Sequence, residues 1–464
     1  MTANRPESET NIFNIFDNAI TDNILKSLPL NDLLRCSQTC KRLRTTCEHR
    51  FRQTFRKKAE QDIHIKLADN GKLSVSSLGV THLKCFDNII KNLTISSWNF
   101  VTNTNLKLEN LTNFMLKKCE TKLRKICIIG DMELDLFGQK IESILCNVQT
   151  VEFGKRRGVA DEVQFLTHCT NLKKLILGSE INSENVDEIL RQRYHRLTQF
   201  CYLYDNGNNL NLQTLKLFFR NNDRIKSIEW KFRMIDHPSR QHFVKCLQTV
   251  GYAEHLTHFR LCFSNQLSKY TSKQFDQICN QLNLLCKRDT FKILEISLID
   301  ATCYIDCDYD NTSIALSRMK SFAKWKQLSK IHLQHFGILT TMPVISEFVH
   351  LKSIVFNSCF LKYDNELVDE GTSMSQISEV VIKNSHFNGV NELCMPLVRH
   401  WANLTKIFLP ICVTYYGFKL DIAELNRARE ELNDACELTI FTNHKSFPSN
   451  MEHRLVKLHC DLNR

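Results

Sequence analysis

One apolar pattern recurs along most of this chain and restricts its possible folds more than any other feature. The pattern is L-x-x-L-x-L, with any bulky apolar residue accepted for leucine, and it runs from about residue 73 toward the C-terminus. Fourteen candidate copies follow one another at steps that average about 26.5 residues. A period kept over so many copies predicts a chain of stacked structural units. The clearest copies are Leu172-Leu175-Leu177, Leu256-Phe259-Leu261, Leu328-Ile331-Leu333, Leu351-Ile354-Phe356 and Leu404-Ile407-Leu409.

The other copies are more degenerate but keep the same internal spacing. In each copy the final x-L-x-L predicts a short strand whose alternate side chains point into a core. No unit can bury its apolar face without its neighbours, so the strands are expected to stack in one parallel sheet. These copies are Ile90-Leu93-Ile95, Leu111-Phe114-Leu116, Leu123-Ile126-Ile128, Val148-Val151-Phe153, Leu197-Phe200-Tyr202, Ile225-Ile228-Trp230, Phe291-Leu294-Ile296, Ile377-Val380-Ile382 and a last strand ending at Ile440.

The segments between the strands carry helical stripes, and the whole resembles a leucine-rich-repeat domain. Its period lies in the range of that family. The third position after the last strand residue, usually Asn or Cys in this family, is filled accordingly in four units, by Cys119, Cys359, Cys412 and Asn443. The resemblance implies a curved parallel sheet with outer helices. The clearest stripes are Val186, Ile189 and Leu190, and Phe275, Ile278, Leu282 and Leu285.

Two spacings depart from the period. Leu116 and Ile128 are too close for a strand and a helix to lie between them, so one of those two copies is not expected to be a true unit. The steps from Leu261 to Ile296 and from Ile296 to Leu333 are longer than the period. Their extra residues must leave the stack as longer helices or loops, which often bind partners in repeat proteins.

A different pattern precedes the repeats, in the segment LPLNDLLRCSQTCKRL at residues 28–43. Pro29 ends the preceding helix because it lacks a backbone donor, and Asn31 or Asp32 is expected to cap a new one. Apolar residues then recur every three or four positions, as on one face of a helix. This second stripe is Leu33, Cys36, Cys40, Leu43 and Cys47, and the upstream one is Phe13, Phe16, Ile20, Ile24 and Leu28.

This helical pair resembles an F-box. Where the family usually begins with Leu-Pro, the chain has Phe16 and Asp17. The resemblance implies binding to the Skp-type adaptor of a cullin-based ubiquitin ligase. The residues that follow the family pattern are Ile20, Ile24, Leu25, Leu28, Pro29, Asp32, Leu33, Leu34, Ser37, Cys40, Lys41, Arg42 and Leu43. The expected adaptor-binding residues are Phe16, Ile20, Ile24, Leu25, Leu28, Pro29, Leu33, Cys36, Cys40 and Leu43.

A third helix is expected to join the F-box to the repeats. Phe51, Phe55, Ala59, Ile63 and Leu67 recur at steps of four, and Asn70 with Gly71 would end the helix. The predicted organisation is therefore α/β. Residues 1–11 form a disordered N-terminus, 12–50 an F-box, 51–72 a linker helix and 73–464 a leucine-rich-repeat solenoid.

Composition excludes several classes of protein. The N-terminus is not a signal peptide and no apolar run could span a membrane. The 20 cysteines are interpreted as reduced core residues, which favours the cytoplasm or the nucleus, and Asn-Leu-Thr at Asn92, Asn110 and Asn403 is not interpreted as a glycosylation site. A net charge of +11 is spread along the whole chain, so a nucleic-acid partner is not expected.

No catalytic or metal-binding motif stands out. The loop at residues 305–311 resembles the start of a calcium loop, but Asn311 replaces the glycine and Ser317 replaces the bidentate glutamate. Cys303 and Cys307 have no histidine cluster beside them, so zinc is not expected either. We predict a non-catalytic protein without a cofactor.

The predicted function is that of a substrate-recognition subunit of an SCF-type ubiquitin ligase. The F-box would bind the adaptor and, through it, a cullin, and the repeats would bind a target protein. The alternatives are a repeat scaffold that acts without the ligase and, less consistent with the scattered charge, a nucleic-acid-binding solenoid. Outward-pointing residues of the strands, a mixed and partly basic set that suits acidic or phosphorylated groups, are the expected target contacts: Glu229, Lys231, Arg260, Ser297, His332, Gln334 and Lys383.

Overall fold

The computed structural model divides the chain by its contacts into two compact units. The first is Met1–Lys173 with Glu180–Asn185, and the second is Lys174–Ser179 with Val186–Arg464. The structure describes residues 24–39, 41–54, 62–67, 73–76, 90–97, 104–119, 122–130, 133–154, 161–178, 181, 183–205, 210–233, 237–264, 277–278, 280–282, 284–285, 290–299, 328–334, 337–340, 350–357, 359–363, 376–387, 389–409, 412–414, 420–442 and 451–460.

The first unit begins with two helices that pack on each other, α2 (Leu30–Ser37) and α3 (Lys41–Thr54). Pro29 is the N-cap of α2, and its carbonyl oxygen accepts from the amide of Leu33 at 3.0 Å. The prediction that Asn31 or Asp32 caps this helix is wrong, because no side chain caps α2 and both residues lie within its first turn. Asp32 instead places its charge near the positive end of the helix dipole.

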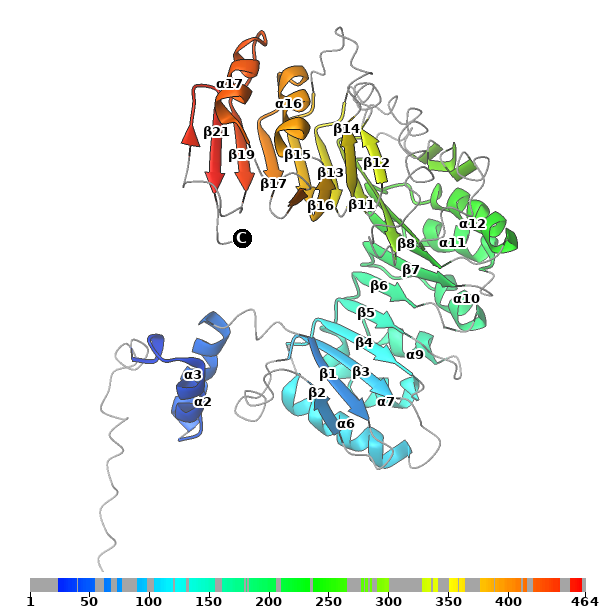
Figure 1. Cartoon of the computed structure of the whole chain (residues 1–464). Helices are drawn as coiled ribbons and strands as arrows, with labels where there is room; N and C mark the ends of the chain where they lie inside the picture. The colour runs from blue at the N-terminus through cyan, green and yellow to red at the C-terminus, as the bar shows by residue number, and fades with distance from the viewer. Residues whose placement is uncertain are drawn as a thin grey trace, which may run out of the picture. The chain divides into compact units, whose positions relative to one another are not determined.

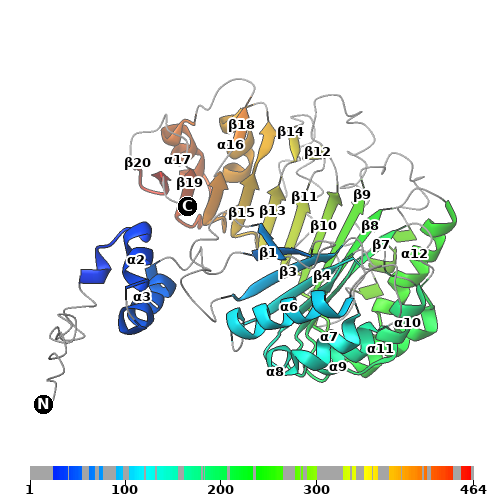
Figure 2. The same ribbon diagram turned by 90° about the horizontal axis from the view of Figure 1, so that it is seen from below.

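Five strands follow in the first unit. β1 (Asp62–Leu67) pairs antiparallel with β2 (Leu73–Ser76) and parallel with β3 (Asn92–Ser97). The parallel order continues through β4 (Lys125–Ile129) and β5 (Thr150–Phe153). Figure 2 shows helices α6 (Thr104–Lys118) and α7 (Leu134–Lys140) along one side of β3 and β4. Two short helices, α8 (Glu142–Leu145) and α9 (Glu162–Thr167), complete the unit.

The predicted linker helix over residues 51–72 is wrong for residues 62–67, and residues 55–61 and 68–72 lie outside the described residues. Residues 62–67 form β1, in which Ile63 and Ile65 are buried while His64 and Lys66 are exposed. Ile63 and Leu67 are four residues apart, a spacing that satisfies both a helical period and a strand period. Hydrogen bonding to β3 decides the outcome in favour of the strand.

The copy Leu111-Phe114-Leu116 is not a strand either. It lies inside α6, where Leu111, Met115 and Cys119 form the buried stripe and Leu116 is exposed. Cys119 therefore belongs to the end of a helix, with its amide bonded to the carbonyl of Met115 at 2.8 Å, and is not a repeat position. The short spacing before Ile128 is explained in this way.

The other thirteen predicted strands are present. In the second unit the strands of the main sheet are parallel in chain order, apart from the antiparallel pair β20–β21. They are β6 (Lys174–Leu177), β7 (Gln199–Asp205), β8 (Ser227–Arg233), β9 (His258–Ser264), β10 (Ile293–Ile299), β11 (Lys330–Gln334), β13 (Ser353–Asn357), β15 (Glu379–Lys383), β17 (Lys406–Leu409), β19 (Leu438–Thr442), β20 (Met451–Glu452) and β21 (Val456–Cys460). In the main sheet the sequence pattern missed β1, β2, β20 and β21.

Helices cover one side of this sheet, as Figure 1 shows for α11 (Leu212–Asn221) and α12 (His237–Val250) beside β7 and β8. The predicted stripe Val186, Ile189 and Leu190 lies in α10 (Ser183–Arg191) and is fully buried. Ile278, Leu282 and Leu285 are also buried, while Phe275 lies outside the described residues. Toward the C-terminus the helices are α16 (Val390–His400) and α17 (Ile422–Glu430).

In four repeats a second short strand follows the strand of the main sheet, and in the last two of them a helix, α16 or α17, comes after it. These strands form a separate parallel sheet of β12 (Gly337–Thr340), β14 (Phe360–Tyr363), β16 (Ser385–Phe387) and β18 (Cys412–Thr414). Cys359 lies between β13 and β14, at the predicted Asn/Cys position, and its thiol donates to the carbonyl of Leu333 at 3.4 Å. The residue at this position therefore bonds to the preceding repeat, which explains the preference for a donor.

Within the described residues, no helix combines the length and the apolar composition needed to cross a membrane. Asn443 and the loops that contain Cys303, Cys307 and residues 305–317 lie outside those residues.

Candidate functional site

The first candidate surface is the helical pair at the N-terminus. Of the ten expected adaptor-binding residues, Leu25, Leu33 and Leu43 are buried at 3%, 0% and 4% exposure. They form its core together with Cys47 and Phe51. Side chains buried in this way hold the two helices together, and a partner would contact others.

Four of the ten residues reach the surface. Ile24 is 53% exposed and Pro29 is exposed, while Leu28 and Cys36 are partly exposed. Ile24, Leu28 and Pro29 precede α2, and Cys36 lies near its end. Exposed apolar side chains that lie this close in sequence are the type of surface that binds a protein partner. Phe16, Ile20 and Cys40 lie outside the described residues.

The second candidate surface is the sheet face of the second unit that lies opposite the buried strand residues. Glu229, Arg260, Glu295 and His332 are paired in register across β8, β9, β10 and β11. Two residues further along, Lys231 is in register with Cys262, Ser297, Gln334, Asn357 and Lys383. All seven residues predicted to contact a target therefore lie on two adjacent rows of one sheet face.

Charged groups on the first row contact one another. The Nε of Arg260 is 3.3 Å from Oε2 of Glu295, and its Nη1 is 3.5 Å from Oε1 of Glu229. His258 Nε2 and His332 Nδ1 approach the Glu295 carboxylate at 3.3 and 3.7 Å. Neither His258 Nε2 nor Arg260 Nε makes a regular hydrogen bond, and the contacts of His258 and His332 are ion pairs only when the imidazole is protonated. Glu295 is thus the centre of a cluster that bridges three strands.

The cluster shifts the pKa of two of its members. Burial raises the pKa of the Glu295 carboxyl, but contacts with His258 and His332 outweigh it and hold the pKa well below its ordinary value. Burial also lowers the pKa of Lys231, but the charges of Cys201 and Glu229 outweigh burial and raise it. Lys231 Nζ lies 3.4 Å from Glu229 Oε1. The cations of this cluster are therefore already matched by carboxylates, which weakens the expectation that they bind a phosphate.

Sequence reasoning missed Glu295 and His258. Glu295 lies between two positions of the apolar strand pattern, Leu294 and Ile296, so the alternation rule that selected Arg260 would also have selected it. His258 is the first residue of β9 and precedes the buried Phe259, so the same rule would have selected it too; the parallel register then places Arg260 opposite Glu295, with His258 two residues before Arg260. Lys383 is exposed on β15, and among the described residues no ion pair involves it.

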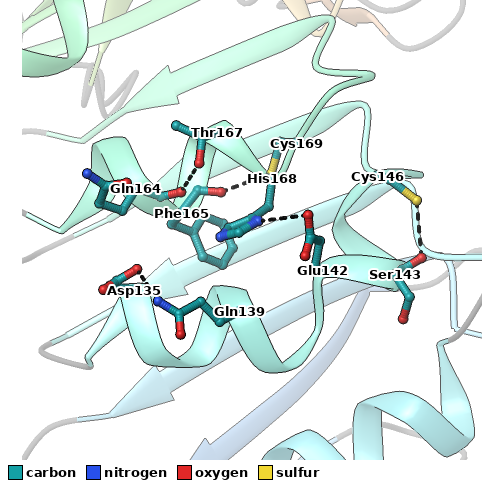
Figure 3. A network of polar contacts seen from close by, with 10 residues as sticks. All are labelled: Asp135, Gln139, Glu142, Ser143, Cys146, Gln164, Phe165, Thr167, His168 and Cys169. Carbon is teal, nitrogen blue, oxygen red and sulfur yellow. Dashed lines mark hydrogen bonds and ion pairs between the residues drawn. The ribbon is translucent and has the colours of Figure 1, made fainter.

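A separate polar network lies in the first unit, around α7, α8 and α9 (Figure 3). Its bonds are mostly local to one turn, such as Gln139 Nε2 to Asp135 Oδ1 at 3.0 Å. His168 Nδ1 and Glu142 Oε1 are 3.4 Å apart and join two of these helices. Gly138 allows this approach, because a Cβ there would lie 3.1 Å from Cδ2 of His168. The network stabilises the packing of neighbouring repeats and contains no pair of nucleophile and base.

In the part of the chain that the structure describes, no group of three or more His, Cys, Asp or Glu side chains is arranged to hold a metal ion. The cysteines of the core are also poor ligands and nucleophiles, because burial raises the pKa of Cys119 and of Cys246 to about 12. The arrangement of side chains in both candidate surfaces is suited to binding.

Comparison with family models bears on the first surface. The family model of the F-box domain matches residues 16–52. The fold is similar to the crystal structure of the Rad7 and Elc1 complex in yeast, with a TM-score of 0.40 and 11% identity over 86% of this chain and 90% of that chain. It is also similar to the leucine-rich repeat-containing protein LegL7 from Legionella pneumophila, with a TM-score of 0.39 and 11% identity over 80% of this chain and 99% of that chain. No curated protein sequence matches this chain at a significant level. The family match and the repeated strands together show that the chain carries an F-box domain near its N-terminus, followed by leucine-rich repeats.

Proposed function

We propose that this protein is the substrate-recognition subunit of an SCF-type ubiquitin ligase. Its F-box domain would bind a Skp-type adaptor and, through it, a cullin, while its repeats bind a target protein. The observation that carries the proposal is the F-box match at residues 16–52 combined with apolar side chains exposed on that domain, above all Ile24.

The repeats support the second half of the proposal. Their strands bring outward-pointing residues from units far apart in sequence onto one face, which is how repeat proteins build extended binding surfaces. In this role the chain supplies no reacting group of its own. It raises the effective concentration of a target lysine near a ubiquitin-loaded enzyme, and that proximity is its contribution to the reaction.

Co-purification of the full chain with a Skp-type adaptor tests the proposal. Ile24→Asp places a charge on an exposed position, so it should weaken the complex without unfolding the F-box. We expect a loss of at least about tenfold in affinity, since burial of one large apolar side chain contributes about 1.5–3 kcal/mol.

Leu217→Asp is the matched control, because Leu217 is 49% exposed on α11 and lies in the repeats. This variant should bind the adaptor as the wild type does. If the folded wild type fails to bind the adaptor, the ligase role is refuted, and the chain acts as a repeat scaffold outside the ligase.

A further inference from the structure

Three aromatic side chains form a continuous stack on the second unit, at the C-terminal end of the sheet face described above. Phe408, Phe441 and His459 are in register on β17, β19 and β21. The rings of Phe408 and Phe441 are stacked with centroids 4.6 Å apart, and those of Phe441 and His459 with centroids 5.7 Å apart. All three side chains are partly exposed. We call these three residues the aromatic strip.

The aromatic strip extends the row that contains the charged cluster. Val355 and Val381 continue the register from His332 to Phe408 on β13 and β15. The same row is therefore charged from β8 to β11, carries two buried valines on β13 and β15, and is aromatic from β17 to β21. The residues predicted from the sequence to contact a target include none of the three residues of the aromatic strip, so the sequence did not predict this division of the row.

The charged and the aromatic parts of this row differ in what it costs a partner to bind them. In the charged part, a partner would have to displace or desolvate carboxylates and cations that already satisfy one another, such as Glu295 and Arg260, and desolvation of such pairs is costly. In the aromatic part, the buried side of the strands is complete without Phe408 and Phe441, since Ile407, Leu409 and Ile440 fill it. The aromatic strip therefore has apolar surface available for contact.

Charged side chains of both signs lie beside the aromatic strip. Lys406 is exposed two residues before Phe408 on the same face, and Lys383 is exposed on β15. Within the described residues neither lysine takes part in an ion pair. Lys457 is paired with Glu437 at 2.9 Å, and Glu379 accepts a hydrogen bond from Ser353 at 2.9 Å. The Glu379 carboxylate keeps its negative charge and is in register with Lys406, so Lys383 and Lys406 are the described cations beside the strip that no ion pair holds.

We propose that the aromatic strip binds a segment of a target protein that carries apolar side chains flanked by aspartate or glutamate. The apolar side chains would cover the ring edges, and the carboxylates would pair with Lys383 and Lys406. The proposal deepens the function proposed above, because it names the part of the repeats that contacts the target and the chemistry of that target.

The stack itself argues against a single-stranded nucleic acid. A protein that holds unpaired bases presents open ring faces on which the bases stack. Here each face of Phe441 is covered by a neighbouring ring, at 4.6 and 5.7 Å between centroids. Apolar side chains that meet ring edges fit this geometry better than bases do.

The test uses the full chain and a random library of twelve-residue peptides displayed on phage. After selection, the enriched peptides are synthesised with a fluorescent label, and their affinities are measured by anisotropy. We expect peptides rich in Leu or Phe together with Asp or Glu. Phe441→Ser should weaken their binding by at least about tenfold, as for a central aromatic contact. Lys406→Glu should weaken it several-fold with no effect on folding, because Lys406 is exposed.

Leu217→Ser is the matched control, since it removes an exposed apolar side chain from a helix, and it should leave peptide binding unchanged. Three results would overturn the proposal: no enriched peptide, enriched peptides that bind the Phe441→Ser variant as tightly as the wild type, or preferential binding of a twelve-residue oligothymidine. Adaptor binding is measured on the same variants. Ile24→Asp should weaken it by at least about tenfold and leave peptide binding intact, so failure of the F-box role and failure of the aromatic strip give different results.

Discussion

The guanidinium group of Arg429 donates from Nη1 to the carbonyl oxygen of Trp401 at 2.5 Å. Its Nη2 donates to the carbonyls of Ala402 and Leu404 at 2.6 and 2.7 Å, and its Nε to that of Cys436 at 3.1 Å. Arg429 is fully buried. One side chain of α17 thus satisfies the carbonyls of the turn that follows α16, and it joins two consecutive repeats.

Replacement of Arg429 by methionine should destabilise the C-terminal repeats by at least about 3 kcal/mol, because several buried carbonyls would lose their donor. The free energy of unfolding can be followed in urea by the fluorescence of tryptophan, since Trp401 lies at the affected turn. Arg427→Met is the control on the exposed face of the same helix and should change stability by less than about 0.5 kcal/mol. Equal stability of the two variants would contradict this role for Arg429.

Glu295 should make the stability of the second unit depend on pH. Contacts with His258 and His332 hold the pKa of the folded carboxyl below its ordinary value of 4.5, in spite of burial. The stabilisation is therefore present in full above that value and is lost as the pH falls from it toward the folded pKa.

The Glu295→Gln variant isolates this effect. At pH 7 it should be less stable than the wild type by about 1–3 kcal/mol, the cost of leaving a buried polar partner, here the Arg260 guanidinium, without its counterpart. The difference should shrink as the pH is lowered below the ordinary carboxyl value. Unfolding curves recorded from pH 7 to pH 3 measure it, with the exposed Glu254→Gln as control. A constant difference over this range would contradict the assignment.

Asp161 should act as a cap for a helix of the preceding repeat. The amides of Leu134 and Asp135, at the start of α7, both donate to its Oδ2, the second at 3.3 Å. No side chain of α7's own N-cap residue, Glu133, does so. Asp161→Ala should therefore cost about 1 kcal/mol, as for a lost N-cap. Asp161→Asn keeps an acceptor oxygen, so it should lower the stability of the helix less. Hydrogen exchange of the α7 amides would distinguish the two variants.

Truncation of Leu33 and truncation of Ile24 to alanine should change the stability of the F-box by very different amounts. Leu33 is fully buried, so Leu33→Ala should destabilise the helical pair by about 2–5 kcal/mol. Ile24 is 53% exposed, and Ile24→Ala should leave its stability almost unchanged. Hydrogen exchange of the α2 and α3 amides measures both variants. Similar protection in the two would show that the packing of this pair differs from the one described.

Strand positions in the repeats could be predicted from the sequence because buried strand residues alternate with a period of two. Thirteen of the fourteen predicted strands are present for this reason. The exceptions have the same physical origin. Residues spaced by four, such as Ile63 and Leu67, satisfy both periods, and only the pairing with β3 selects the strand. The copy at Leu111 was predicted to be a strand but lies in a helix, because its apolar residues fit both the helical period and the repeat pattern.

The sequence by itself determined the repeating strands, the α/β class and the F-box pattern, since each depends on the spacing of neighbours along the chain. Only the tertiary structure decided which of the F-box residues are core and which are surface, because that depends on how α2 packs against α3. It also decided the partners of Glu295, which come from strands more than thirty residues away in either direction. Because the repeats differ in length, no fixed separation in the sequence predicts such neighbours. The hydrogen-bonded register between strands brings them together.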